Sequence, residues 1–147
     1  MSEYYSMKIA GLKRNLEKFS VSDKLDIAAF IIFGDVELTI AGCSELLKKV
    51  PEFDIILTPE AKSIPIAYEM ARQSGKPYVI ARKGVKVYMR NSIEVSVNSI
   101  TTKNEQKLYL GETEVNKLKG KRVLIIDDVI KNVDEAVRIR VYKKSKY

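Results

Sequence analysis

The sequence contains no histidine, no tryptophan and a single cysteine, Cys43, among its 147 residues. Without histidine, a Ser–His–Asp triad, a Cys–His pair, an imidazole general base and an imidazole zinc site are all excluded. One cysteine cannot form an intramolecular disulfide, and Cys43 occupies the apolar face of an expected helix, which indicates core packing. No apolar run approaches the ~18 residues of a membrane span, and residues 1–15 lack the apolar core of a signal peptide. These absences predict a cytoplasmic protein without membrane contact.

Acidic residues are fewer than basic ones, with 19 Asp and Glu against 26 Lys and Arg and a net charge of +7. Five of the seven net positive charges lie near the C-terminal end, in Arg138, Arg140, Lys143, Lys144 and Lys146. The basic character is therefore mostly a tail, and such tails are usually solvated ends. Because the tail lacks a recognised nucleic-acid motif, nucleic-acid binding is a minor hypothesis.

A hydrophobic content of 46% and a length of 147 residues predict one globular domain. We divide it into an N-terminal arm or hood over 1–33, an α/β core over 34–130 and an atypical basic tail over 131–147. Within the arm, residues 4–19 fit either two strands joined at Gly11 or a short extended arm. Ser22 is expected to cap a helix, and the apolar stretch 25–33 is expected to be buried.

The core shows alternating strand and helix signals. Apolar spacing of three and four predicts a helix over 36–50, capped by Asp35, and a second helix ends at Gly75. Short apolar runs at 54–58, 77–81 and 123–126 predict buried strands, and residues 85–89 a further strand. Residues 93–100 are expected to pair with 108–110 as a hairpin. Strands that alternate with helices predict an α/β fold with a mostly parallel, Rossmann-like sheet.

Polar residues follow three of the expected strands. Asp127 and Asp128 follow one, Glu60 to Ser63 another, and Arg82 with Lys83 a third. Since the carboxyl ends of parallel strands share one edge, 59–63 and 127–128 should face the same crevice. Three plainer interpretations stay open: the acidic pair also occurs in receiver domains of response regulators, Glu60 could merely cap the following helix, and Arg82 with Lys83 could form a solvated turn.

These motifs resemble the type I phosphoribosyltransferases, and most closely their adenine phosphoribosyltransferase-like branch. Residues 123–130, VLIIDDVI, are similar to the start of the phosphoribosyl pyrophosphate signature, in which an apolar strand leads to two acidic residues. The segment that follows the earlier strand is similar to the pyrophosphate-binding loop of the branch and comprises Glu60, Ala61, Lys62 and Ser63. Arg82 and Lys83 resemble its basic pair, with Tyr88 shortly beyond.

The resemblance implies the type I phosphoribosyltransferase fold and transfer of a phosphoribosyl group from phosphoribosyl pyrophosphate to a purine base, most similar to adenine salvage. It implies Asp127 and Asp128 as catalytic residues, magnesium bound together with the substrate, and a homodimer. Binding of the substrate is implied for Glu60, Ala61, Lys62, Ser63, Arg82, Lys83 and Tyr88. Residues 90–105 would then form a mobile hood over the site, or else an ordinary exposed hairpin.

The sequence departs from this family directly after the acidic pair. The family continues with a glycine-rich turn around the 5′-phosphate, whereas this chain has KNVDE at 131–135, without glycine or hydroxyl and with two carboxylates. Three explanations stay open: a degenerate relative that senses a nucleotide or phosphoribosyl compound without catalysis, a truncated or frame-shifted C-terminal part, or a replacement element over 133–141. The first is the alternative function.

Overall fold

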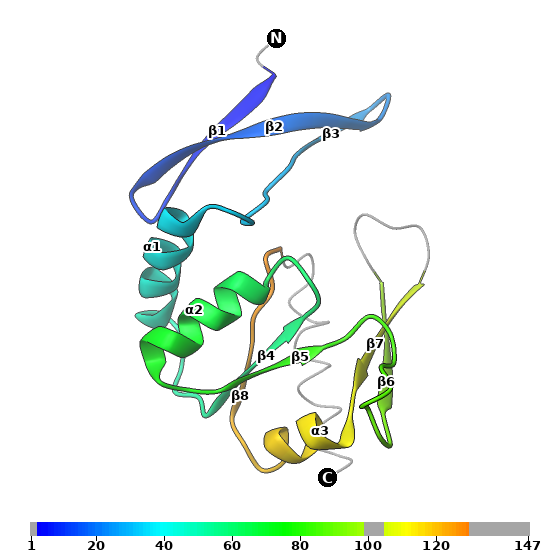
Figure 1. Cartoon of the computed structure of the whole chain (residues 1–147). Helices are drawn as coiled ribbons and strands as arrows, with labels where there is room; N and C mark the ends of the chain where they lie inside the picture. The colour runs from blue at the N-terminus through cyan, green and yellow to red at the C-terminus, as the bar shows by residue number, and fades with distance from the viewer. Residues whose placement is uncertain (1–2, 99–104, 130–147) are drawn as a thin grey trace.

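The computed structural model describes residues 3–98 and 105–129, and a parallel three-stranded sheet lies at its centre. The strand order is β5-β4-β8, with β4 at Ile55–Pro59, β5 at Tyr78–Ala81 and β8 at Val123–Ile125. Helices α1 (Val36–Leu47) and α2 (Ile64–Ser74) pack against each other beside this sheet (Figure 1). The α/β fold with a mostly parallel core sheet, predicted above, is confirmed.

Strand β4 is buried on both faces, which explains its unbroken apolar sequence. Ile56, fully buried, belongs to the core formed with α1 and α2, together with Cys43 and Met70. The neighbouring Ile55 and Leu57 belong to a second core on the other face. That face is covered by α3 (Glu112–Leu118) and by the hairpin of β6 (Ile93–Asn98) with β7 (Glu105–Leu110).

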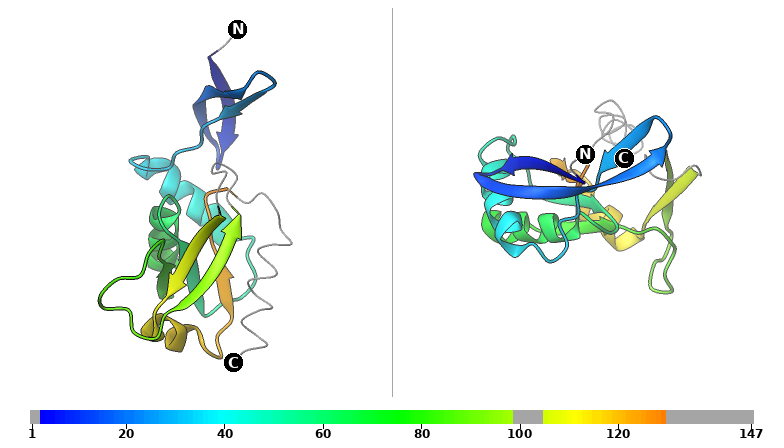
Figure 2. Two further views of the ribbon diagram at one scale, coloured as in Figure 1. Left: turned by 90° about the vertical axis from the view of Figure 1, so that its right-hand side faces the viewer. Right: turned by 90° about the horizontal axis from the view of Figure 1, so that it is seen from above.

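An antiparallel arm of three strands, in the order β1-β2-β3, projects from this body (Figures 1 and 2). Its strands are β1 (Tyr4–Ile9), β2 (Leu12–Ser22) and β3 (Leu25–Ala28). Ala10 and Gly11 turn the chain with positive φ angles of 49° and 81°. The strand–turn–strand interpretation of 4–19 is therefore confirmed, and the arm contacts the core through Ile9 and Leu12.

The arm is also held by an ion pair with the first helix. Arg14 on β2 donates from Nε to Asp35 Oδ2 at 2.6 Å and from Nη2 to Asp35 Oδ1 at 3.0 Å. Asp35 caps α1 as predicted, because its Oδ1 accepts from the Leu38 N–H at 3.1 Å. Gly75 ends α2 in the left-handed conformation with φ 69°, also as predicted.

Three predictions about local structure are wrong. Of the stretch 25–33, Ile32 is buried at 4% exposure, but Leu25 and Phe33 are 54% and 52% exposed, because the arm is a single layer without a second layer over it. Ser22 ends β2 rather than capping a helix, and its Oγ accepts from the Lys24 N–H in the following turn. Residues 85–89 form a turn closed by Met89 N–H donating to Lys86 O at 2.9 Å, not a strand.

Helix α3 was not predicted, because its seven residues contain only two apolar side chains, Val115 and Leu118. The hairpin expected at 93–110 is confirmed by the β6–β7 register, which pairs Ile93 with Leu110. Residues 99–104, which fall within the expected hood 90–105, and the expected tail at 131–147 lie outside the described residues. In the part of the chain that the structure describes, no helix is both long and apolar enough to span a bilayer.

Candidate functional site

The carboxyl ends of β4 and β8 lie side by side, and both carry polar residues predicted for the site. The two strands pair in parallel from Ile55 with Val123 to Leu57 with Ile125. Beyond the last strand pair, Ile126 N–H donates to Leu57 O at 2.9 Å. The pairing therefore brings the loop after β4 next to Asp127, across about 65 residues of sequence. The expected convergence of these two segments is confirmed.

Ser63 links the two segments from a buried position. It is 1% exposed, accepts from Thr58 Oγ1 at 2.7 Å and donates to Pro59 O at 3.1 Å. Its hydroxyl also contacts Asp127, a contact that lowers the pKa of that carboxyl. Ser63 therefore fixes the shape of the loop 59–63 beneath its surface. The sequence analysis did not single out Thr58 as part of the site, although its hydroxyl in an otherwise apolar strand is a signal that points to it.

The pKa of the Asp127 carboxyl is raised, and the largest cause is the loss of water around the carboxyl. Although the residue as a whole is exposed to solvent, the protein atoms around its carboxyl, followed by the neighbouring Asp128, raise the pKa of Asp127 to about 6. Asp128 N–H donates to Asp127 Oδ1 at 2.8 Å and partly offsets the shift. A carboxylate with this pKa changes charge near neutral pH and can both accept hydrogen bonds from hydroxyls and stabilise a nearby positive charge.

Glu60 joins the loop after β4 to the turn after β5. Its Oε2 accepts from the Lys83 N–H at 2.8 Å and lies 3.3 Å from Arg82 Nε. The Lys83 N–H, followed by the Arg82 charge, holds the pKa of Glu60 below its usual range despite an opposing effect of burial. The backbone N–H of Glu60 also donates to Ala81 O at 2.9 Å, which extends the β4–β5 pairing. The peptide bond between Glu60 and Ala61 is cis.

The backbone of Arg82 is held by two hydrogen bonds to strand β7. Its N–H donates to Tyr109 O at 2.9 Å and its carbonyl accepts from Tyr109 N–H at 2.7 Å, so the turn is tied to β7. The buried Arg82 Nε–H has no hydrogen-bond acceptor among the described residues, since its contact with Glu60 has the distance of an ion pair but not the geometry of a hydrogen bond. The anion beside this buried Nε is the carboxylate of Glu60, so the pair of Arg82 and Glu60 holds the turn after β5 against the loop after β4.

The remaining predicted residues are less closely gathered. Lys62 and Lys83 are exposed, and Ala61 is half-buried between Glu60 and Lys62. Tyr88 lies 65% exposed in the turn 86–89, and the structure records no contact between it and the other predicted residues in the described part of the chain. The structure thus brings together Glu60, Arg82 and Lys83 in one group, and Ser63 with the acidic pair in another, while Tyr88 stays apart.

At the amino ends of β4 and β8, away from the acidic pair, the strands are held together by a residue that the sequence analysis did not single out. Arg122, directly before β8, donates from Nη2 to Asp54 Oδ1 at 2.9 Å and from Nη1 to Glu52 Oε2 at 2.7 Å. Its N–H also donates to Asp54 Oδ2 at 2.8 Å. These bonds fix the register of β4 against β8, and that register places Asp127 beside Ser63.

Two acidic residues are too few to form a metal site without other ligands. In the described ranges, no group of three or more Asp, Glu, Cys or His side chains is arranged to hold an ion. Magnesium, however, is usually bound through one or two carboxylates together with substrate phosphates. Asp127 and Asp128 fit a magnesium ion that arrives with a phosphorylated substrate, and the other expected partners of the ion would come from that substrate.

Comparison with known proteins gives one family and several relatives. A family model described as "Phosphoribosyl transferase domain" matches residues 34–132. The hypoxanthine/guanine phosphoribosyltransferase of Methanothermococcus okinawensis is 42% identical over 84 residues, which cover 56% of this chain and 42% of the relative. The adenine phosphoribosyltransferase of Thermotoga petrophila is 34% identical over 94 residues, which cover 63% of this chain and 52% of the relative.

A regulatory protein is also similar to this chain. The purine biosynthesis transcriptional repressor PurR of Bacillus subtilis is 34% identical over 80 residues, which cover 54% of this chain and 27% of the repressor. Among solved structures, adenine phosphoribosyltransferase from Thermoanaerobacter pseudethanolicus matches with a TM-score of 0.60 at 19% identity, over 77% of this chain and 66% of that one. That likeness concerns the fold alone. The chain spans about half or less of the length of these curated relatives.

Proposed function

The chain belongs to the phosphoribosyl transferase domain family, and from this premise we propose that it binds phosphoribosyl pyrophosphate with magnesium and transfers the phosphoribosyl group to a purine base. The observation that carries this proposal is the Asp127–Asp128 pair at the carboxyl end of β8, beside the loop 59–63. In this proposal the bond from the anomeric carbon to pyrophosphate breaks and a bond to a base nitrogen forms. Adenine is the proposed base, and both the adenine- and the hypoxanthine/guanine-specific relatives support a purine.

Asp127 and Asp128 would accept hydrogen bonds from the two ribose hydroxyls. As pyrophosphate departs, positive charge develops at the anomeric carbon, and nearby carboxylates stabilise it more strongly than they stabilise the ground state. This role requires the ionised form of the pair, which the pKa of about 6 for Asp127 allows at neutral pH. Magnesium would neutralise part of the diphosphate charge and support its departure.

The diphosphate would lie against the cationic side of the site. Lys62 and Lys83 are exposed, and Arg82 carries a third positive charge whose Nε faces Glu60 Oε2 at 3.3 Å. Glu60 neutralises part of this charge, but its contacts with the turn 82–83 also hold that turn against the loop. Cations held in fixed positions bind phosphate oxygens strongly because the hydrogen bonds are charge-assisted. Tyr88 is the weakest member of the proposed set because it lies apart.

The test is isothermal titration calorimetry of the chain with phosphoribosyl pyrophosphate and magnesium. The proposal expects binding that is lost in a variant combining Asp127→Asn and Asp128→Asn. A matched control combines Asp23→Asn and Asp26→Asn on the arm, which removes the same charge far from the acidic pair. Equal binding by both double variants, or no binding by the unmodified chain, contradicts the proposal.

A second candidate function is binding without catalysis. It is favoured by the similarity to the repressor PurR and by the absence of glycine at 131–135, where the family has its 5′-phosphate turn. Under this alternative the chain binds phosphoribosyl pyrophosphate but releases no pyrophosphate when adenine, hypoxanthine or guanine is added. A coupled assay of pyrophosphate release with each base separates the two functions. We also propose that the chain forms a homodimer and is located in the cytoplasm, because the family it belongs to supports both.

A further inference from the structure

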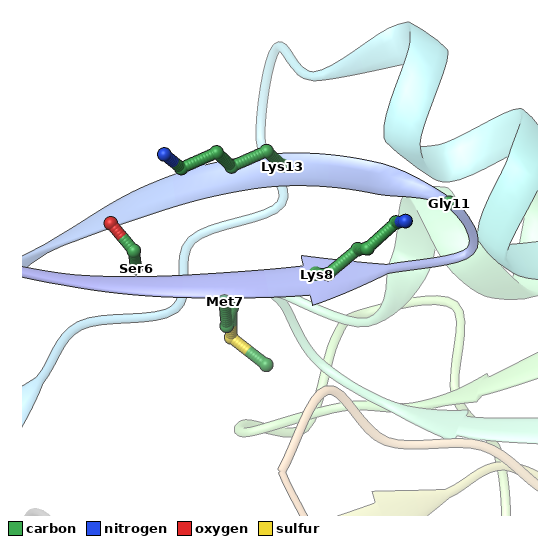
Figure 3. A pocket seen from close by; sticks show the side chains of 5 residues that line it. All are labelled: Ser6, Met7, Lys8, Gly11 and Lys13. Carbon is green, nitrogen blue, oxygen red and sulfur yellow. The ribbon is translucent and has the colours of Figure 1, made fainter.

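Polar side chains meet at a buried position beneath the loop 59–63, and not in the open hollow of the arm. That hollow is lined by Ser6, Met7, Lys8, Gly11 and Lys13, and Figure 3 shows the side chains of its two lysines pointing away from each other. At the carboxyl end of β4, by contrast, Thr58 and Ser63 place two hydroxyl groups in contact at 0% and 1% exposure. These two hydroxyls lie directly under the loop that carries Glu60, Ala61 and Lys62.

Thr58 introduces a buried hydroxyl into a strand that is otherwise apolar. The side chains of a strand alternate between its faces, so Thr58 lies on the same face as Ile56, which packs in the core formed with α1 and α2. Valine has nearly the same shape and suits a buried strand without bringing a polar atom into it. Because a buried hydroxyl costs free energy unless it is hydrogen-bonded, the partner of this hydroxyl explains the position.

The partner is the hydroxyl of Ser63, at the other end of the loop. Thr58 Oγ1 donates to Ser63 Oγ at 2.7 Å, and Ser63 Oγ donates to Pro59 O at 3.1 Å. A hydroxyl has a single proton, so Ser63, which accepts from Thr58, keeps its own proton for Pro59 O. Thr58 is itself fixed in the sheet, where it pairs with Ile80 of β5. The two ends of the loop are therefore tied together and anchored to the sheet.

Ser63 occupies a position where serine usually stabilises a helix. It is the N-cap residue of α2, yet its side chain makes no capping hydrogen bond. A serine hydroxyl at this position normally accepts from an N–H of the first helical turn, as the Asp35 carboxylate does for α1. The Ser63 hydroxyl binds within the loop instead. Such departures from a local stability rule are concentrated at functional sites.

We propose that Thr58 is a positioning residue for the binding of phosphoribosyl pyrophosphate: through the Ser63 hydroxyl it holds the loop 59–63 in the shape that receives the diphosphate. This inference rests on the proposed function, in which Lys62 of this loop faces the diphosphate. Thr58 holds the loop from beneath, while Glu60 holds its outer side through the Lys83 N–H at 2.8 Å. A loop that is already ordered binds its ligand without the entropy cost of ordering.

The first experiment measures the dissociation constant of phosphoribosyl pyrophosphate with magnesium by calorimetry in Thr58→Val, which removes the hydroxyl and keeps the shape of the side chain. We expect binding about tenfold weaker, the factor that corresponds to one lost hydrogen bond. Thr58→Ser keeps the hydroxyl and should bind within about twofold of the unmodified chain. The matched control is Thr39→Val, which removes another buried hydroxyl, bound to Asp35 O at 2.7 Å, and should leave binding unchanged.

A double-mutant cycle tests whether Thr58 acts through Ser63. Ser63→Ala should also weaken binding, and adding Thr58→Val to it should weaken binding no further, because both changes break the same contact. Losses that multiply overturn the proposal, as does a Thr58→Val variant that binds as tightly as Thr39→Val. If the unmodified chain does not bind, the proposed function is wrong and this role falls with it. If the unmodified chain and Thr58→Val bind equally, only the positioning role is wrong.

The second experiment follows the loop without ligand, by amide hydrogen exchange. Ile64 N–H donates to Ala61 O at 3.2 Å across the loop, so its exchange rate reports whether the loop keeps its shape. This amide should exchange about tenfold faster in Thr58→Val and in Ser63→Ala, and at an unchanged rate in Thr58→Ser and Thr39→Val. Unchanged exchange at Ile64 in Thr58→Val overturns the proposal. Equal acceleration over the whole chain also overturns it, because that result indicates a general loss of stability.

Discussion

The ionisation of Asp127 makes the acidic pair sensitive to pH in a range where an ordinary aspartate is not. Its pKa is raised to about 6, first by burial and then by Asp128. The carboxyl should therefore be about nine-tenths ionised at pH 7 and about one-tenth ionised at pH 5, whereas an aspartate with its usual pKa stays ionised at both. A ligand whose ribose hydroxyls require the Asp127 carboxylate should bind about tenfold more weakly at pH 5 than at pH 7.

The same shift predicts the direction of a stability change. Because the pKa of Asp127 is higher in the folded state, the folded chain binds this proton more tightly than the unfolded chain does. The contribution of Asp127 to stability is therefore present at low pH and is lost as the pH rises through about 6. Asp127→Asn, which cannot ionise, should be more stable than the unmodified chain at pH 7 by about 1 kcal/mol after allowance for solvent screening. That advantage should vanish near pH 4.

Carbon-13 NMR of the aspartate carboxyls measures this pKa directly. The Asp127 signal, assigned by its absence from Asp127→Asn, should have its midpoint well above the usual pKa of an aspartate side chain. Asp128→Asn should lower the midpoint, because the neighbouring acid raises it, and Ser63→Ala should raise it further, because the Ser63 contact lowers it. A midpoint in the ordinary aspartate range, or one unmoved in both variants, refutes the reasoning.

Four further predictions follow from other contacts. Glu60→Ala frees the Lys83 N–H and should weaken phosphoribosyl pyrophosphate binding in calorimetry, while Glu60→Gln, which can still accept that bond, should keep more of the affinity. Ala10→Asn relieves a positive φ of 49° and should raise the free energy of unfolding by about 1 kcal/mol in urea. Met70→Ala empties a fully buried core position and should lower it by about 2–5 kcal/mol in the same assay. Asp35→Ala removes the α1 cap and should cost about 1 kcal/mol, with a loss of helical circular dichroism on heating.

The sequence was most informative where one local pattern had one structural solution. The apolar run of β4 must be covered on both faces, and the structure covers it with α1 and α2 on one face and α3 with the β6–β7 hairpin on the other. Gly75 ends α2 because glycine adopts the left-handed conformation without a side-chain clash. The convergence of 59–63 with Asp127 was predictable for a related reason, since parallel neighbours bring their carboxyl ends to one edge.

The roles of the polar site residues depended on partners from other elements. Glu60 had the same sequence signal as a helix cap, and only the structure shows it accepting from Lys83 N–H across 23 residues. Ser63 was predicted as part of a substrate-binding loop, and only the structure shows that its hydroxyl is buried, where it accepts from Thr58 Oγ1 and donates to Pro59 O. Hydrogen bonds between distant segments depend on the packing of strands and turns, which spacing along one segment does not encode.

The sequence by itself determined the order of α1, β4, α2, β5 and β8, the N-cap of α1 and the C-cap of α2, and the end of the sheet where the acidic pair lies. Tertiary structure alone decided that most of the apolar stretch 25–33 is exposed and that the pKa of the Asp127 carboxyl is raised to about 6. The physical reason is that periodicity reports which side of an element is apolar, a property of neighbouring residues. Exposure, charge pairing and pKa are set by which distant groups surround a side chain, and these are known only once the layers have packed.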